Sequence, residues 1–360
     1  MDFRAFVMKT IIRISIFFAF ICLFALFIFK TFDAPLSADK RTVTSDLNVI
    51  FELEGSVLFI VRAGETASSV GKRLEASGLI RSSLLWTILA RIDSEPIKTG
   101  TYRLRGPLGT LAIRELFISG KQLLIKVTVP EGYTLKKVAS LLESNGITDA
   151  AEFMSAAKDT ELLKSYGIPG KSVEGYLYPD TYFLPRSYPA EQAVRAMVDT
   201  FFRRIEKIAT KAISSYSSDE LYRTVTLASI VEREYRVNDE APLIAGVFHN
   251  RLRIGMALQS CATVEYVITE IQGKAHPEVL YNKDIAIPDS YNTYVNRGLP
   301  PGPISSPGHV SLDAAFNPMP NDYLYFRLEN PSEGRHRFSR TLNEHVKSGT
   351  IYVKRLKAGS

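Results

Sequence analysis

The chain has 360 residues, of which 46% are hydrophobic and 23% charged, and its formal net charge is +6. This composition can bury the cores of roughly two or three domains and excludes a disordered chain. The basic residues are scattered, without a dense run or interleaved aromatic residues, so no nucleic-acid binding is predicted. The modest positive charge fits an ordinary solvated surface, and equally a protein that works beside an anionic polymer or lipid.

The N-terminal region predicts a membrane anchor at residues 14–30. Together with the isoleucines just before it, the apolar run reaches roughly 18 to 20 residues, about the length of a helix that crosses a bilayer. Three basic residues precede the run, so the positive-inside rule places residues 1–13 in the cytoplasm. A cleaved signal peptide is the alternative, although its apolar core would be unusually long. We expect an uncleaved single-pass anchor in a bacterial inner membrane, with the rest of the chain in the periplasm.

The two cysteines offer no disulfide framework outside the membrane, because Cys22 lies within the predicted anchor and Cys261 has no partner. A polar linker is expected at 31–50.

A repeated pattern follows the linker. Between residues 59 and 80, and again between 126 and 147, the chain reads as a short strand, a Gly-x-Thr turn and an amphipathic helix that ends at a glycine. Residues 68 positions apart match: Val61/Val129, Gly64/Gly132, Thr66/Thr134, Val70/Val138, Leu74/Leu142, Glu75/Glu143 and Gly78/Gly146. The pattern resembles LysM modules, which are small glycan-binding folds, and predicts a LysM-like region at 51–147. A purely structural strand–turn–helix unit is the alternative.

The segment 173–185 contains two prolines and several aromatic residues, which argues against a helix interior. It is either a loop packed by its own rings or one wall of a cleft in which sugars stack on aromatic faces. In the second case Glu174, Asp180 and Tyr182 are candidates for contacting the sugar.

Two glutamates interrupt an apolar helix that is predicted from Leu221 to about Tyr235. On a helical wheel Glu232 lies in a hydrophobic stripe and Glu234 lies nearly opposite. We interpret Glu234 as a solvated or ion-paired residue. Glu232 is either paired with a buried Arg or Lys, or it is a carboxyl with a raised pKa, which is what a general acid needs near neutral pH.

The residues downstream favour a glycan as the ligand. A second helix is predicted over 240–253, and the segment 290–318 is rich in Asn, Ser, Thr, Tyr, Gly and Pro. Such a segment predicts a stiffened loop that offers neutral hydrogen-bonding groups. A buried acid beside this loop suits an uncharged polyol. The five histidines show no ligand spacing, so no metal site is predicted.

Several motifs together resemble the endolytic murein transglycosylases (the MltG, or YceG-like, family) from about residue 50 to 350. They are EGYLYPDTY, ASIVEREY with the helix that follows it as far as LQS, SYNTYVNRGLPPGPISSPG, and YLYFRLENPSEGRHRFSRTLNEH. The resemblance implies a membrane-anchored periplasmic lyase that needs no cofactor. Such enzymes cut the β-1,4 bond between MurNAc and GlcNAc in nascent peptidoglycan, leave 1,6-anhydro-MurNAc ends and terminate strand elongation. The catalytic glutamate of the family falls on Glu232.

The resemblance also suggests which residues line the cleft, by their positions in the motifs. They are Gln259, Ser260, Tyr291, Asn292 and Thr293. Cys261 departs from the family pattern, in which many relatives carry an acid. A cysteine nucleophile with His249 as its base has no support beyond the residue types. The implied partners are peptidoglycan strands and the inner membrane, with peptidoglycan synthases or division and elongation proteins as further candidates.

The expected fold is α+β. It comprises an N-terminal transmembrane helix, the LysM-like α/β module, and a mainly helical catalytic domain at 148–355 with a small C-terminal sheet near 323–339. Two rival functions are a non-catalytic peptidoglycan-binding scaffold and a lysozyme-like glycoside hydrolase. The lyase needs a single protein carboxyl, because its nucleophile belongs to the substrate, whereas ordinary glycoside hydrolysis uses two.

Overall fold

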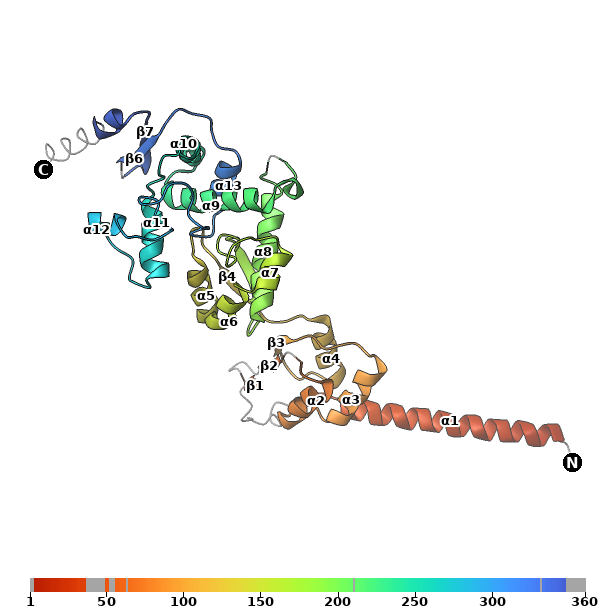
Figure 1. Cartoon of the computed structure of the whole chain (residues 1–360). Coiled ribbons are helices and arrows are strands. Elements are labelled where there is room, and N and C mark those ends of the chain that lie inside the picture. The colour runs from red at the N-terminus through yellow and green to blue at the C-terminus, as the bar shows by residue number, and fades with distance from the viewer. Residues whose placement is uncertain are drawn as a thin grey trace. The chain divides into compact units, whose positions relative to one another are not determined.

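The computed structural model describes residues 3–36, 49–51, 56–62, 64–209, 211–330 and 332–347 (Figure 1). They form two compact units that divide between Leu124 and Ile125, with the short segment Pro185–Ser187 belonging to the first unit. Most of the predicted linker at 31–50 and the end of the predicted catalytic domain at 348–355 lie outside the described residues.

The first unit begins with a long apolar helix, α1 (Phe3–Asp33). Its stretch from Ile14 to Asp33 has a mean hydropathy of 2.4 and is long and apolar enough to cross a membrane. Most of the large side chains of this stretch are exposed, and Phe17 has two thirds of its surface free, at 66%. The predicted apolar helix is therefore confirmed, and it continues a few residues past the predicted end of the anchor.

The rest of the first unit is a small sheet with three helices. Its elements are β1 (Val49–Phe51), β2 (Val57–Val61), α2 (Ala67–Ala76), α3 (Ser83–Ile92), β3 (Gly100–Leu104) and α4 (Thr110–Ser119). The sheet is antiparallel in the order β1-β2-β3. Phe59, Trp86, Tyr102 and Phe117 bring their rings together at the centre of its core.

The second unit is mainly helical, with two small two-stranded sheets, β4–β5 and β6–β7. Its first half holds β4 (Leu124–Thr128), α5 (Leu135–Ser144), α6 (Ala150–Ala156), α7 (Thr160–Ser165), β5 (Thr181–Pro185) and α8 (Ala190–Ile205). Its second half holds α9 (Ser218–Glu234), α10 (Ala241–Arg253), α11 (Cys261–Tyr266) with a π-helical turn at Val267–Ile271, α12 (Asn282–Ile285), α13 (His309–Phe316), β6 (Tyr325–Asn330) and β7 (Arg335–Ser339). Short 3-10 turns at Ile213–Ser215 and Asn238–Glu240 precede α9 and α10. The mixed helix and small-sheet content of the predicted fold is confirmed.

Both copies of the repeat adopt the same local structure. Gly64 and Gly132 have φ angles of +72° and +73°, and the side chains of Thr66 and Thr134 cap α2 and α5. The copies nevertheless belong to different units, because the apolar face of α5 packs into the large core of the second unit. The boundary between the units thus falls inside the region predicted at 51–147. The likeness of this region to LysM modules stays a prediction.

Helix α9 lies at the centre of the second unit and is buried along its middle, as its apolar sequence predicts. It begins with a capping box in which Ser217 and Glu220 bind each other's backbone N–H groups. Helices α10 and α13 both pack against it (Figure 1). The packing of α13 brings residues 308–311 to the C-terminal end of α9, where Glu232 lies.

Candidate active site

The end of α9 and the start of α13 meet at Glu232. Its carboxyl oxygen Oε2 accepts hydrogen bonds from the backbone N–H of Gly308 at 2.9 Å and from the hydroxyl of Ser311 at 2.6 Å. Gly308 is the N-cap of α13, so both donors lie at the positive end of a helix. Neither donor carries a charge, and within the described residues Glu232 forms no ion pair. The buried ion pair that was the alternative for Glu232 is therefore not the arrangement seen.

Burial raises the pKa of Glu232 to about 7, from an ordinary value of 4.5. Loss of solvent is the largest cause, because it disfavours the charged carboxylate. The hydrogen bonds from Ser311 and Gly308 act in the opposite direction, and the negative charge of Glu131 raises the pKa further. A carboxyl with a pKa near 7 keeps its proton in much of the protein at neutral pH and can deliver it as a general acid.

The Gly-x-Thr turn of the second repeat copy forms a wall beside Glu232. A Cβ atom on Gly132 would lie 3.8 Å from Cγ of Glu232, so the bare backbone of the turn reaches the acid. The turn is fixed to the segment before α13, because Gly132 N–H donates to Ser306 C=O at 2.9 Å and Ser306 N–H donates to Tyr133 C=O at 2.7 Å. The second copy of the repeat is therefore part of the candidate site.

Glu131 is a site residue that the sequence alone did not single out. Its carboxylate lies against Gly308, where a Cβ atom would overlap it. A glycine at 308 thus serves two purposes, since its N–H holds Glu232 and its missing side chain leaves room for Glu131. The available signal in the sequence was that an acid, Glu131, directly precedes the turn glycine Gly132 of the second copy.

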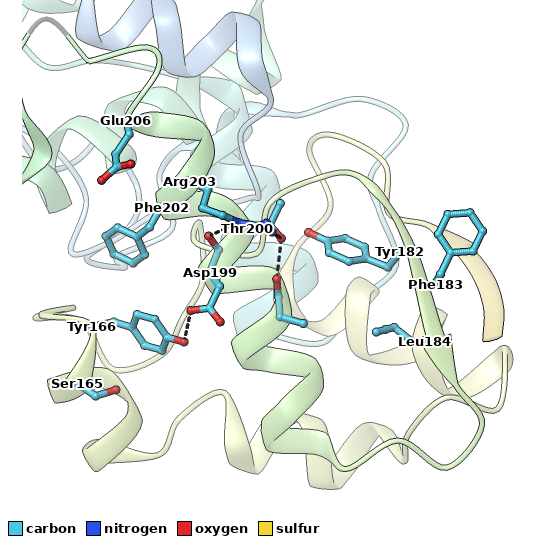
Figure 2. Close-up of a pocket in the computed structure, with 11 residues that line it drawn as sticks. Ser165, Tyr166, Tyr182, Phe183, Leu184, Asp199, Thr200, Phe202, Arg203 and Glu206 are labelled. Carbon is cyan, nitrogen blue, oxygen red and sulfur yellow. Dashed lines mark hydrogen bonds between the residues drawn. The ribbon is translucent and has the colours of Figure 1, made fainter. Parts of the chain in front are cut away.

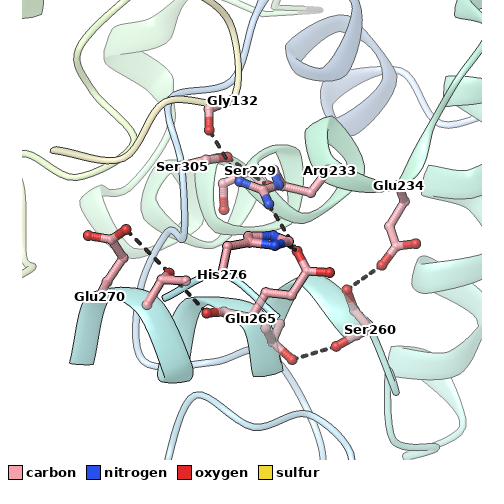
Figure 3. A network of polar contacts seen from close by, with 11 residues as sticks. Gly132, Ser229, Arg233, Glu234, Ser260, Glu265, Glu270, His276 and Ser305 are labelled. Atoms are coloured by element: carbon pink, nitrogen blue, oxygen red, sulfur yellow. Dashed lines mark hydrogen bonds and ion pairs between the residues drawn. The ribbon is translucent and has the colours of Figure 1, made fainter. Parts of the chain in front are cut away.

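The predicted cleft residues Gln259, Ser260 and Thr293 lie together around Glu234. The Ser260 hydroxyl donates to the Glu234 carboxylate, as Figure 3 shows. The N–H groups of Gln259 and Ser260 donate to the C=O and the hydroxyl of Thr293 at 3.1 and 3.0 Å. Gln259 has a φ of +50°, a left-handed conformation that is uncommon for residues other than glycine.

The interpretation of Glu234 as a solvated or ion-paired residue is wrong. Its carboxylate lies in the wall of a cavity, and burial raises its pKa. The helical wheel correctly placed it away from Glu232, but it could not show that the loop at Gln259 and Ser260 covers that side of α9.

Glu174 and Asn292 hold backbone rather than facing open space. Glu174 accepts hydrogen bonds from the N–H of Leu135 at 3.0 and 3.1 Å, and burial raises its pKa to about 8. It thereby anchors the first residue of α5. The buried Asn292 amide donates to the carbonyls of Ile285 and Ile287 at 3.0 and 2.8 Å. Both contacts favour a positioning role.

Tyr291, another predicted cleft residue, is partly buried. Its ring packs against that of Tyr266, with the ring centroids 5.1 Å apart.

Asp180 and Tyr182 lie apart from Glu232, near a groove of about 930 Å³ between β5 and α8 (Figure 2). Tyr182 lines this groove and donates its hydroxyl to Tyr178 C=O at 2.6 Å, and Asp180 pairs with Arg204 at 2.7 Å. Glu232 does not line this groove, and the candidate active site around it lies at the junction of α9 and α13.

Cys261 does not form a nucleophile–base pair with His249 within the described residues. Its sulfur lies 3.1 Å from the hydroxyl of Tyr294, and burial raises the pKa of the thiol, which disfavours the reactive thiolate. His249 lies near Ala315 instead.

Comparisons with known proteins identify the family of the chain. Curated relatives named endolytic murein transglycosylase are 28% identical over 323 residues in Streptococcus pneumoniae D39 and 29% identical over 341 residues in Bacillus subtilis. These alignments cover 81% and 90% of this chain; the chain spans 57% of the first relative and 89% of the second. A crystal structure of a YceG-like protein from Listeria monocytogenes matches with a TM-score of 0.54 and 31% identity, covering 81% of this chain and 98% of that one. The model of the YceG-like family matches residues 59–350, and the chain therefore belongs to the YceG-like family.

Proposed function

We propose that the protein is a membrane-anchored lytic transglycosylase that cuts the glycan strands of peptidoglycan internally. The observation that carries the proposal is Glu232, a carboxyl held by two neutral donors with its pKa raised to about 7. Membership of the YceG-like family and the names of the relatives support the same activity.

In this reaction Glu232 acts first as an acid and then as a base. Its proton passes to the oxygen of the β-1,4 bond between N-acetylmuramic acid (MurNAc) and N-acetylglucosamine as that bond breaks. The carboxylate then takes the proton of the MurNAc C6 hydroxyl, whose oxygen closes onto C1. The products are a 1,6-anhydro-MurNAc end and a free 4-hydroxyl, and Glu232 regains its proton. Gly308 N–H and the Ser311 hydroxyl stabilise the carboxylate between the two steps.

One observation favours the lysozyme-like hydrolase as a second candidate. Hydrolysis of a glycoside uses two carboxyl groups, and Glu131 supplies a second carboxylate next to Gly308. The two reactions leave different ends, so their products distinguish them: the lyase leaves anhydro ends and the hydrolase leaves reducing ends.

The apolar helix α1 is the proposed membrane anchor. From Ile14 to Asp33 none of its most apolar window is buried within the protein, as expected for a helix that faces lipid. Basic residues precede this stretch, so the positive-inside rule places the N-terminus in the cytoplasm and the catalytic unit on the periplasmic side of the inner membrane. Anchoring would hold the enzyme near newly made strands, whose cleavage would terminate their elongation. Synthases and division or elongation proteins are the proposed partners at that place.

The test is product analysis with the full-length protein in detergent. Uncrosslinked peptidoglycan is incubated with the wild type and with Glu232→Gln, and the released ends are identified by mass spectrometry. We expect anhydro ends from the wild type alone. Reducing ends would establish the hydrolase instead, and the absence of cleavage by either protein would leave a peptidoglycan-binding scaffold.

A further inference from the structure

A second cavity of about 340 Å³ lies on the Glu234 side of α9, and Glu232 is not among the residues that line it. Arg233, the chain neighbour of Glu232, lines it. Arg233 donates to the Gly132 carbonyl of the turn beside Glu232 at 3.4 Å and forms an ion pair with Glu265 at 3.0 Å (Figure 3). The cavity therefore begins at the wall of the active site.

Positive charge predominates in the lining of this cavity. The basic residues are Arg233, Arg236, Arg251, Arg327 and His336, and the acids are Glu234 and Glu265. The polar groups of Gln259, Cys261 and Tyr294 complete the lining. Such a lining suits an anionic ligand that also offers hydrogen-bonding groups.

Three of the five basic groups are already used by the fold. Arg233 pairs with Glu265, and His336 contacts Glu240 through Nδ1 at 2.8 Å. The buried Arg251 donates to the carbonyls of Leu258 and Leu324, at 2.6 Å each. These groups hold the walls of the cavity in place.

Arg236 and Arg327 are different, because within the described residues neither has an ion-pair partner. Arg236 follows the end of α9 and is exposed. Arg327 lies on β6 directly opposite Arg337 of β7, an arrangement of like charges that costs stability. Glu329 neutralises Arg337 at 3.0 Å, whereas Arg327 has no acid of its own. Within the described residues these two cations thus form no ion pair that stabilises the fold, and a ligand carboxylate would give them a partner.

We propose that this cavity binds a carboxylate of the peptide that the MurNAc residue of the substrate carries, through Arg236 and Arg327. The inference rests on the proposed function, which supplies a peptide-bearing glycan as the substrate. The peptide is attached to the same sugar whose glycosidic bond is cut, and the cavity adjoins the acid that cuts it. Binding there would fix the sugar at Glu232 and favour strands that carry acidic peptides.

The test measures binding rather than cleavage, so that it stands independently of the reaction. The full-length protein in detergent is titrated with N-acetylmuramyl-pentapeptide and with the same compound after its carboxylates have been converted to methyl amides. We expect the wild type to bind the acidic compound at least about tenfold more tightly, with an advantage that shrinks as salt is added. The double variant Arg236→Gln/Arg327→Gln should lose this advantage.

Arg223→Gln is the matched control, because Arg223 is an exposed arginine of α9 that does not line the cavity. It should bind like the wild type, and thermal unfolding should show all variants folded. Equal affinity of the wild type for the two compounds, or an undiminished advantage in the double variant, would overturn the proposal. In parallel, cleavage of strands stripped of peptides should be unchanged in the double variant. If the wild type cleaves no strand, the proposed function fails while the binding result still decides the role of the cavity.

Discussion

The two copies of the repeated turn show how one local structure serves two purposes. Around Gly64 the turn is self-contained: Glu65 pairs with Arg73 of the following helix at 2.8 Å, and a Cβ atom on Gly64 would meet nothing within 4 Å. Around Gly132 the turn contacts another segment of the same unit. Its neighbour Glu131 lies against Gly308 and has no ion-pair partner among the described residues. The two copies therefore share one backbone turn but differ in the acid beside the glycine. In the first copy this acid forms an ion pair that stabilises the turn, and in the second it lies next to the candidate site.

The largest contrast should be between Glu232, the carboxyl that the second turn contacts, and Glu65, the carboxyl within the first turn. Glu232→Gln removes the proton that the proposed reaction needs, so we expect strand cleavage to fall by about 10³-fold, within the usual range for a general acid. Glu65→Gln in the first copy should leave the rate constant of cleavage unchanged. Rates of anhydro-end formation, measured on the same peptidoglycan, check both variants. Cleavage by Glu232→Gln at more than a tenth of the wild-type rate would remove Glu232 from its role.

Glu232→Gln should also make the protein more stable relative to the wild type as the pH rises. The carboxyl of Glu232 has a pKa of about 7 in the folded protein and 4.5 as its ordinary value. The unfolded chain therefore ionises first, and the folded state loses stability between about pH 4.5 and 7. Glu232→Gln avoids this loss, which amounts to at most about 3 kcal/mol at pH 8.

Urea unfolding of both proteins at pH 5 and pH 8 measures this effect. The stability of the variant relative to the wild type should increase between the two pH values. A constant difference would mean that the carboxyl ionises normally in the folded protein, and the account of Glu232 as a proton donor would lose its physical basis.

Much of this arrangement could be predicted from the sequence, and the limit of prediction lies at contacts between distant segments. The apolar stripe on α9 identified Glu232, and the Gly-x-Thr pattern predicted the shape of both turns, because each depends on neighbours within about one helical turn. Glu131 and Ser311 reach Glu232 only through the packing of α13 and the second turn on α9. No local pattern marks such contacts.

The same reason explains the mistaken interpretation of Glu234. Helical periodicity describes the direction of a side chain but not what covers it. The loop that carries Ser260 supplies that cover, and it follows 26 positions later in the chain. The predicted cleft role of Gln259 and Ser260 came from the family resemblance and stays a prediction; of the two, Gln259 lines the cavity beside Arg233.

Substitution of the glutamates beside the two turn glycines should change activity in the second copy and stability in the first. Glu131→Gln removes a negative charge that raises the pKa of Glu232, so the pH above which activity declines should move downward. Cleavage at pH 8 should fall by about 3-fold, because the charge of Glu131 raises the pKa of Glu232 less than burial does, while stability changes by less than about 0.5 kcal/mol, because Glu131 is exposed. Glu65→Gln should cost about 1 to 3 kcal/mol, because its side chain is only 8% exposed and ion-paired, and should leave the pH profile unchanged.

The smallest effect should come from Gly308→Ala. This variant tests whether Glu131 acts on Glu232 through its negative charge. Gly308 has an ordinary φ of −86°, so alanine introduces no backbone strain there, and its N–H can still bind Glu232. The new methyl group would overlap only the flexible end of Glu131 and push that carboxylate aside. We therefore expect a smaller shift of the pH profile in the same direction as in Glu131→Gln, with a cleavage rate at pH 8 that is about 2-fold lower. In the Glu131→Gln background the alanine should have no further effect on the profile, because there is no longer a charge to displace. A full additional shift in the double variant would show that Gly308 acts on Glu232 through its backbone alone, and the second turn would then resemble the first in being purely structural.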